Sequence, residues 1–255
     1  MSQETLKKKN KTKSLKDKKW PANLCGIICG LSIIIATVVI SVQTNIADND
    51  VFVKEYVKTG VDKDLGMDIN DVAFVSQEMM KYLFGQREEL SVITTMFGKE
   101  RDFFNDRERA HMVDVKALLD NVILVRNICF GLIILSIIGL LYLKGKMVGI
   151  YYFCKGYLIS VAIAIAAIGS VGLFILSSGF TEFWNRFHGV FFTNDLWLLD
   201  YNTDMMIRLL PESFFSTLVT NCVISFVIIV GVLAVLACII VQTLKTSRFR
   251  LKNRL

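Results

Sequence analysis

Residues 122–143 read VILVRNICFGLIILSIIGLLYL, and this stretch decides the class of the protein. Its one charged residue is Arg126, and a helix rising about 1.5 Å per residue over this length crosses the hydrocarbon core of a bilayer, about 30 Å thick. Three more stretches are comparably long and apolar, at residues 22–43, 156–178 and 217–243. The sequence therefore predicts an all-α membrane protein with four transmembrane helices.

The segments between these stretches differ in composition and set the expected organisation. The chain is 53% hydrophobic, above the usual range of soluble domains, yet five segments are polar or basic. We expect a basic cytosolic tail at 1–21, an extracellular amphipathic region at 44–121, a cytosolic loop at 144–155, an extracellular aromatic loop at 179–216 and a basic cytosolic tail at 244–255.

The distribution of basic residues predicts the orientation. Both tails are rich in lysine or arginine, and the short connection carries Lys144, Lys146 and Lys155 without an acidic residue. Short basic segments remain in the cytosol, so both termini are expected there and both long loops outside. The net charge of +6 lies mostly in the tails, which suits a membrane surface better than nucleic acid.

Helical periodicity is visible in the first long loop. Apolar residues recur at helical spacing in this order: Val72, Val75, Met79 and Leu83. Asp68 or Asp71 suits the start of this helix and Gly85 its end. A second helix, carrying His111, is expected to continue into residues 122–143. We expect the loops after the first and third spans to form an extracellular helical cap.

Several kinds of chemistry find little support. The sequence has no GxSxG elbow, P-loop or HExxH motif, and no nucleic-acid-binding motif. The six cysteines lie within or beside apolar runs, so no disulfide framework is implied. Two histidines with Asp200 or Asp204 can in principle bind zinc, but their spacing is not diagnostic. We expect neither a metal nor a cofactor.

The two histidines of the chain, His111 and His188, both fall in the predicted external loops beside a span. Histidine titrates near neutrality and can therefore accept and return a proton. His111 precedes Asp114 by one helical turn, where a carboxylate can orient the imidazole. The alternative for His111 is a solvated helix end without a chemical role.

His188 lies within the aromatic stretch FTEFWNRFHGVFF at residues 180–192. If the chain beyond it is helical, Asp200, Asp204 and Arg208 form a stripe at i, i+4 spacing. The alternative here is an aromatic belt at the membrane interface with a surface ion-pair ladder. Pro211 followed by Glu212 predicts the start of the fourth helix.

Two motifs resemble the signatures of a known family. The stretch FNDRERAHMVDVK at residues 104–116, and FHGVFF at 187–192 followed by Trp197 and Asp200, resemble those of the lipoprotein intramolecular transacylase (Lit) family of integral membrane proteins from low-GC Gram-positive bacteria. The resemblance covers nearly the whole chain after the lysine-rich tail. One departure is Tyr201, where the family pattern leads us to expect proline.

The resemblance implies an acyltransferase at the outer leaflet of the bacterial cell membrane. Its substrates would be diacylated bacterial lipoproteins, its surroundings membrane lipids, and nucleic acid would not be a partner. The enzyme would move the sn-2 acyl chain of the S-diacylglyceryl cysteine onto the α-amino group of that cysteine, giving lyso-form lipoprotein. The nucleophile is then the substrate's own amine, and the protein supplies acid–base groups.

On this interpretation His111 and His188 are the acid–base pair, with their separate roles left open. Candidate supporting residues, as orienters or as oxyanion and headgroup contacts, are Asp114, Lys116, Arg126, Asp200, Asp204 and Arg208. Candidate lipid-binding residues are Trp184, Phe187, Phe191, Phe192 and Trp197. A non-catalytic lipid- or lipoprotein-binding accessory protein is the alternative function. A transporter is disfavoured because the spans lack paired intramembrane charges.

Overall fold

The structure is a computed structural model that describes the backbone of residues 19–252 and the side chains of residues 19–246. Most of the predicted N-terminal tail (residues 1–18) and the last residues of the C-terminal tail (253–255) lie outside the described residues. The described chain is predominantly α-helical, as the sequence predicted.

Contacts within the chain define two compact units. The first unit comprises Met1–Val39, Leu124–Ser170 and Ser225–Leu255. The second unit comprises Ile40–Ile123 and Val171–Ile224. Both predicted site histidines belong to the second unit, so the candidate site can be described within it.

By length and composition, three helices of the described residues could cross a membrane. These are α2 (Trp20–Ile46), α6 (Asp106–Ser178) and α9 (Glu212–Lys252). The sequence predicted four separate spans. In the structure, two of them, at residues 122–143 and 156–178, belong to the single element α6, which is 73 residues long.

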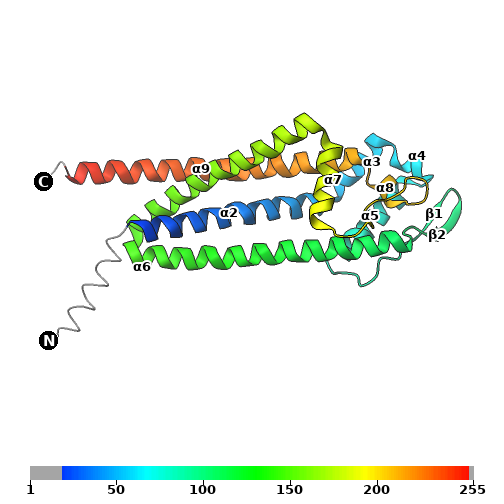
Figure 1. Cartoon of the computed structure of the whole chain (residues 1–255), viewed down its shortest axis with the longest axis horizontal. Coiled ribbons are helices and arrows are strands. Elements are labelled where there is room, and N and C mark those ends of the chain that lie inside the picture. Colours follow the sequence, from blue (N-terminus) through cyan, green and yellow to red (C-terminus); the bar gives the residue numbers. More distant parts are fainter. Residues whose placement is uncertain (1–18, 253–255) are drawn as a thin grey trace. The chain divides into compact units, whose positions relative to one another are not determined.

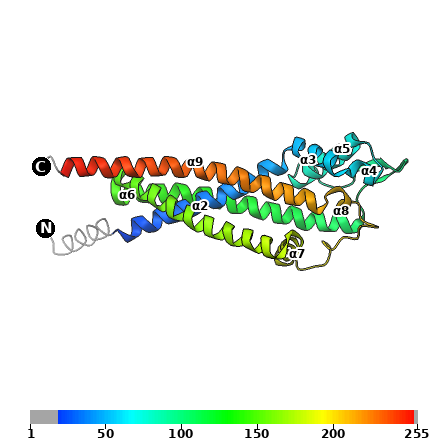
Figure 2. The same ribbon diagram turned by 90° about the horizontal axis from the view of Figure 1, so that it is seen from above.

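A single glycine interrupts α6. Gly145 has φ 71° and ψ 176°, a positive-φ conformation that residues with a Cβ rarely adopt. Figures 1 and 2 show the chain reversing there, and beyond the reversal the backbone at Gly149 lies close to the carbonyl of Leu140. Residues 144–155, predicted as a short cytosolic loop, are thus helical except at Gly145, because one glycine makes the reversal and the helix resumes immediately.

The first unit is held by close backbone approach. A Cβ placed on Gly156 would lie 2.1 Å from the carbonyl carbon of Gly26, so α2 and the second arm of α6 touch through glycine. The Tyr157 hydroxyl donates to the Val230 carbonyl on α9 at 3.1 Å. The buried core of this unit consists of Ile34, Cys154, Tyr157, Ala164, Phe226, Val230 and Ala237.

The second unit contains short helices. They are α3 (Asn49–Thr59), α4 (Val61–Leu65), α5 (Ile69–Leu83) and α8 (Met206–Leu209), together with α7, described below. Asp48 caps α3, and the Asp68 carboxylate accepts from the Asn70 backbone N–H at 2.8 Å to cap α5. The predicted helix between Asp68 and Gly85 is thus confirmed.

A β-hairpin in the second unit was not predicted. Strands β1 (Ile93–Met96) and β2 (Lys99–Asp102) pair antiparallel, with Met96 opposite Lys99. The two turn residues, Phe97 and Gly98, both have positive φ, at 50° and 76°, which is the conformation of a tight hairpin turn. The β-branched run before Gly98 was the signal for this hairpin.

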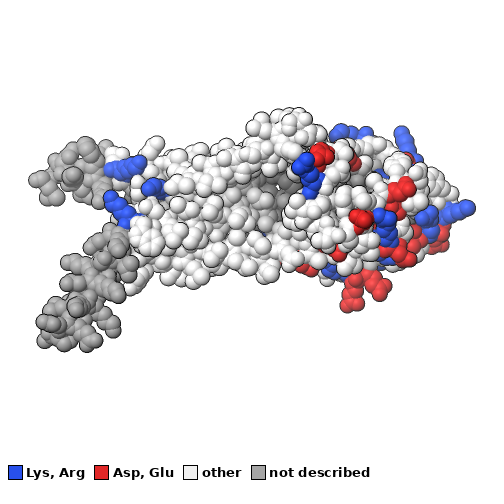
Figure 3. Space-filling view, in the orientation of Figure 1, with Lys and Arg blue, Asp and Glu red and all other residues white. Residues whose placement is uncertain are grey.

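An aromatic and aliphatic core holds the second unit together. Phe52 of α3 packs edge-on against Phe214 at the start of α9, with ring centroids 4.8 Å apart. The most deeply buried members of the core are Tyr56, Leu65, Val72, Val75, Met79, Phe103 and Leu209. Figure 3 shows charged side chains dense over the second unit, whereas the helices of the first unit present a largely uncharged surface on this face.

Candidate active site

The first residues of α6 build one side of the site. The Asn105 side chain accepts from the Glu108 backbone N–H at 2.9 Å, and the Glu108 carboxylate accepts from the Asn105 N–H at 2.7 Å. This reciprocal capping box satisfies two orphan donors and fixes the first turn of α6. His111 follows Glu108 by three residues, so its place on α6 is set by a firmly capped helix end.

Helix α7 (Phe180–Phe191) builds the other side. Trp184, Phe187, His188 and Phe191 recur at i, i+3, i+4 and i+7, which places them on one face of this helix. The Trp184 and Phe187 rings stack, with centroids 5.5 Å apart. The amphipathic pattern explains why the predicted aromatic loop is helical in its first third.

The structure brings the two histidines together. Their ring centroids are 6.2 Å apart, and both side chains are almost fully buried, with residue exposures of 5% for His111 and 7% for His188. Phe192 lies against both imidazoles, at 5.2 Å from His111 and 5.6 Å from His188. Residues 77 positions apart in sequence therefore form one shielded site.

Aromatic rings enclose His188. Trp197 stacks on the imidazole with centroids 4.9 Å apart and planes inclined by 25°. Trp184 meets it edge-on at 4.6 Å, and Phe187 does so at 5.6 Å. Phe191 contacts Phe187 but not the imidazole, and half of its surface is exposed. Four of the five predicted lipid-binding residues thus contact a histidine ring.

The hydrogen bonds of the two imidazoles differ. His188 Nδ1 lies 2.8 Å from the Trp184 carbonyl oxygen, which can only accept, so Nδ1 carries the proton and the neutral ring keeps its lone pair on Nε2. His111 Nδ1 is buried and has no hydrogen-bond partner within the described residues. A buried ring nitrogen without a partner is unusual and favours a ligand atom there.

Burial keeps both histidines neutral at physiological pH. It lowers the pKa of His111 to about 4, assisted by the neighbouring His188 and opposed by Asp114. Burial also lowers the pKa of His188, opposed by the hydrogen bond to the Trp184 carbonyl. Two neutral imidazoles side by side can accept protons, which is what a general base requires.

A buried carboxylate ties α6 to the loop before α8. Glu108 is fully buried, and its second oxygen accepts from the Met206 backbone N–H at 2.5 Å. Asp204, also buried, accepts from the Asn105 amide at 2.7 Å and from the Asp200 N–H at 2.7 Å. Burial, with a contribution from Asp204, raises the pKa of Glu108.

The predicted supporting residues on α6 are placed as follows. Asp114 accepts a hydrogen bond from the Asn194 amide at 2.8 Å, so its carboxylate binds the loop after α7. The Lys116 ammonium lies 4.5 Å from the centroid of the Tyr82 ring. Arg126 belongs to the first unit, where its guanidinium contacts Asn127 and the Phe130 ring. The structure therefore joins Asp114 to the aromatic loop.

The predicted stripe of Asp200, Asp204 and Arg208 is not formed. Residues 201–203 form a turn, and α8 is only four residues long, so i, i+4 spacing does not align these side chains. Arg208 instead pairs with Asp64 at 2.8 Å and lies over the rings of Phe97 and Tyr201. The condition for the stripe, a helical segment, is not met, because the Asp200 and Asp204 side chains bond to nearby backbone N–H groups.

Two residues at the site were missed by sequence reasoning. Arg107 donates to two backbone carbonyls of the loop after α7, and Asn194 bonds to Asp114 in the same loop. The spacing of Asn105 and Glu108 was a readable capping signal, whereas nothing in the local pattern indicated the partners of Arg107. A contact across about 90 residues cannot be found from periodicity.

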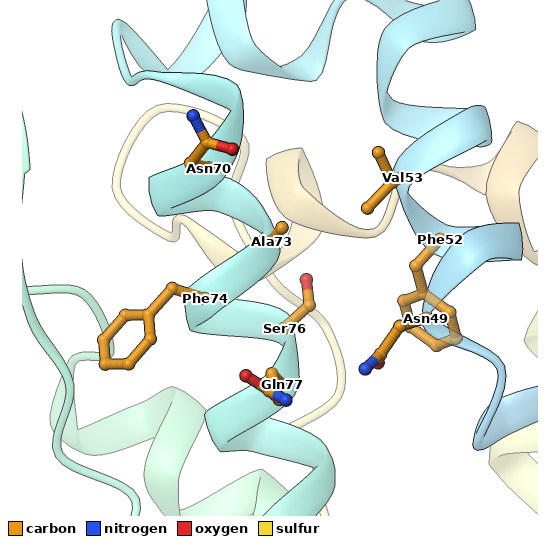
Figure 4. Close-up of a pocket in the computed structure, with 8 residues that line it drawn as sticks. All are labelled: Asn49, Phe52, Val53, Asn70, Ala73, Phe74, Ser76 and Gln77. Carbon is orange, nitrogen blue, oxygen red and sulfur yellow. The ribbon is translucent and has the colours of Figure 1, made fainter.

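The described residues contain no group of three or more His, Cys, Asp or Glu side chains that could hold a metal ion. The pocket shown in Figure 4 lies elsewhere in the second unit, between α3 and α5, with a volume of about 210 Å³. Phe52, Phe74, Asn49 and Asn70 are among its lining residues. It contains no titratable side chain, so the histidine pair is the better candidate for chemistry.

Comparisons with known proteins identify a family and similar solved structures. Residues 27–215 match the family described as "Lipoprotein intramolecular transacylase Lit". The comparison with curated proteins found no match. Among solved structures, the membrane integral lipoprotein intramolecular transacylase Lit from Bacillus cereus is similar, with a TM-score of 0.67 and 17% identity. That match covers 91% of this chain and all of the other.

Two further Bacillus cereus Lit structures, in which one histidine is replaced by arginine or by alanine, also have a TM-score of 0.67. Both are 18% identical to this chain. The first match covers 89% of this chain and 94% of the other; the second covers 88% and 96%. At this identity the structural likeness shows a shared fold.

The fold, with its long apolar helices, defines an all-α integral membrane protein. Because the family match extends over most of the sequence, the chain belongs to the lipoprotein intramolecular transacylase family. The family predicted from the sequence is thereby confirmed.

Proposed function

We propose that the second unit transfers the sn-2 acyl chain of a lipoprotein's S-diacylglyceryl cysteine onto the α-amino group of that same cysteine. The product is an N-acyl, S-monoacylglyceryl lipoprotein. Family membership supports a transacylase acting on a lipoprotein. The observation that carries the proposal is the pair of buried imidazoles, 6.2 Å apart, within an aromatic enclosure.

The substrate supplies its own nucleophile, so the protein must chiefly supply groups that transfer protons. The amine nitrogen forms a bond to the ester carbonyl carbon, and the bond from that carbon to the sn-2 glyceryl oxygen breaks. An α-amino group with a pKa of about 7.7–8.0 is mostly protonated at neutral pH, so a base must first remove one proton. A second proton leaves the nitrogen after attack, and one proton ends on the glyceryl oxygen.

The two imidazoles suit separate parts of this sequence. Since Nδ1 of His188 donates to the Trp184 carbonyl, we assign Nε2 of His188 as the atom that accepts the proton from the amine. We assign His111, whose buried Nδ1 has no partner within the described residues, to the proton transfer at the glyceryl oxygen. Both roles need neutral rings at rest, which the lowered pKa values supply.

The aromatic enclosure supports the positioning of the substrate. Reaction between two groups of one lipid-modified cysteine depends on holding amine and ester in near-attack geometry. Stacked rings of Trp184 and Phe187 offer a rigid apolar wall for acyl chains, and Trp197 covers the imidazole. Water excluded from this wall cannot compete with the amine for the ester.

We further propose a four-span topology, with both termini in the cytosol and the second unit at the outer leaflet. The reversal at Gly145 supports two spans within α6, at residues 122–143 and 156–178. Lys144, Lys146 and Lys155 lie at or near this reversal, and short basic segments favour the cytosolic side.

Peptide mass spectrometry tests the function. Wild-type protein and the variants His111→Ala and His188→Ala would be expressed in bacteria lacking a transacylase of this family, and the N-terminal lipopeptides analysed. Each substitution should lower the rate by about 10²–10⁴-fold, the usual size of an acid–base contribution. Phe74→Ala, an exposed change on α5, serves as the control and should retain activity.

Near-wild-type yield of lyso-form lipoprotein from either histidine variant would contradict the proposed chemistry. Purified wild-type protein that binds lipopeptide without converting it would favour the accessory-protein alternative. Topology has its own test, in which single cysteines at Thr95 and Thr193 should react with an impermeant thiol reagent in intact cells. Labelling only after permeabilisation would overturn the four-span arrangement.

A further inference from the structure

The Arg107 side chain binds an exposed turn of the loop after α7. The turn runs from Asp195 to Leu198 and is closed by the Leu198 N–H, which donates to the Asp195 carbonyl at 3.1 Å. One guanidinium nitrogen of Arg107 donates to both of these carbonyls, at 2.6 Å to Asp195 and 2.8 Å to Leu198. The side chain therefore holds both ends of one turn from the firmly capped start of α6.

This turn carries Trp197, the residue that stacks on His188. The indole and imidazole centroids are 4.9 Å apart, with planes inclined by 25°. Residues 193–195 and 198 are exposed, so apolar burial does little to fix this stretch. Side-chain hydrogen bonds must therefore fix the position of this stretch. Those of Arg107 bind the turn that contains the indole.

A second contact, made by Asn194, links the same loop to α6 just before this turn. The Asn194 side-chain oxygen accepts from the Leu196 N–H at 3.1 Å, and its amide donates to Asp114 at 2.8 Å. Arg107 and Asp114 both lie on α6, seven residues apart. Two turns of one helix thus hold a loop that would otherwise be free to move the indole.

We propose that Arg107 is a positioning residue, which holds Trp197 against His188 and so fixes the orientation of the imidazole for proton transfer. The inference rests on the proposed function of His188. Arginine suits the task because its planar guanidinium presents several donors in a fixed geometry and stays charged. A lysine ammonium can reach the same carbonyls, but a flexible stem holds it less firmly.

The variants Arg107→Gln and Arg107→Lys test the proposal, with Arg101→Gln as the control. Arg101 is an exposed arginine on β2 of the same unit, so its loss removes an equal charge without touching the turn. Arg107→Gln should lower kcat by about 10–100-fold, since small misplacements of a reacting group have effects of this size. KM should change little, and Arg107→Lys should recover part of the loss.

Nuclear magnetic resonance of the histidines supplies a readout independent of turnover. The chain has two histidines, so protein labelled at the imidazole carbon should give two assignable signals. Arg107→Gln should shift the His188 signal and move its titration to higher pH, because a displaced indole leaves the ring better hydrated. The His111 signal should change less, and Arg101→Gln should leave both unchanged.

A double-mutant cycle decides whether Arg107 acts through Trp197. Arg107→Gln combined with Trp197→Ala should be no slower than Trp197→Ala alone, whereas independent effects would multiply. Multiplicative losses, an unshifted His188 signal, or unchanged kcat in Arg107→Gln would each overturn the proposal. Full activity of His188→Ala would instead overturn the proposed function, while the shift of the His188 signal in Arg107→Gln would still report whether the turn is held.

Discussion

The two units of this protein are stabilised by different kinds of interaction. Within residues 19–252, every Asp and Glu belongs to the second unit, whereas the first unit packs apolar helices through glycine and a few buried hydroxyls. The second unit relies on caps, buried carboxylates and aromatic pairs. A directional network can hold two imidazoles at a set separation, and close backbone packing can hold helices where water is absent.

This contrast teaches where chemistry can be placed. Proton transfer requires polar atoms at fixed positions, and these need hydrogen-bonding neighbours or they lose free energy on burial. The second unit supplies such neighbours around His188 and Glu108. The first unit supplies apolar surface and closely packed backbone. Changes in the second unit should alter turnover, and changes in the first should alter stability.

The largest effect is expected from the histidine pair. If His111 and His188 act in one proton-transfer sequence, the double alanine variant should lose far less activity than the product of the two single losses of about 10²–10⁴. Rates from lipopeptide conversion by purified variants check this. Multiplicative losses would show that the two rings act separately, although they lie side by side.

Removing the buried carboxylate should be the next largest effect. Glu108→Ala leaves the Asn105 and Met206 N–H groups without their acceptor, at an expected destabilisation of about 2–4 kcal/mol. Glu108→Gln retains one acceptor oxygen and should fall between wild type and alanine. Thermal unfolding in detergent measures both. Equal stability of Glu108→Ala and wild type would contradict the network account of the second unit.

A glycine contact tests the first unit. Gly156→Ala forces a Cβ into the backbone of Gly26, so overpacking should destabilise the protein by about 1–3 kcal/mol. The matched control is Gly169→Ala on the same arm of α6, where a Cβ meets no atom within 4 Å. That control should be neutral or slightly stabilising. Turnover by the folded fraction of Gly156→Ala should match that of wild type. A reduced kcat would contradict the expectation that changes in the first unit alter stability and not turnover.

The smallest effect is a shift in pH dependence. In the proposed mechanism neutral His111 is the active form, so activity should fall as pH drops toward its pKa of about 4. Asp114 raises that pKa, so Asp114→Asn should lower it and extend activity to more acidic pH. The ratio of variant to wild-type rates cancels the titration of the substrate amine. This ratio should be constant above pH 6, at a level that also reflects the altered Asn194 contact, and should rise toward pH 4; a ratio that falls toward pH 4 would contradict the predicted direction of the pKa change.

Much of the fold could be predicted because it depends on local patterns. Apolar runs identified the long helices, Asp68 identified the start of α5, and Pro211 with Glu212 identified the start of α9. The reversal at Gly145 was misread as a twelve-residue connection, because lysines there resemble a loop although they continue the helix. Charge patterning gives orientation and says little about backbone conformation.

The site was predictable in its residue types and only partly in its geometry. His111 and His188 were selected because the chain has two histidines, and Trp184 and Trp197 because aromatic residues are frequent in their segment. The hydrogen bonds around them could not be predicted, because they join residues 80 to 99 positions apart through turns. Arg208 was assigned to the site and contacts Asp64 instead, since a stripe drawn on an assumed helix fails where the chain turns.

The Glu108 carboxylate has a consequence for the order in which the protein assembles. One of its oxygens completes the first turn of α6, and the other receives the N–H of Met206, 98 residues further along the chain. Formation of this helix end and arrival of the loop before α8 are therefore thermodynamically coupled. In a chain whose loop is still undocked, Glu108 lacks the Met206 donor and the burial that the docked loop provides. Acid–base competence should thus arise together with the closing of the aromatic enclosure, so that a half-folded protein does not offer an open imidazole pair to water and ester alike.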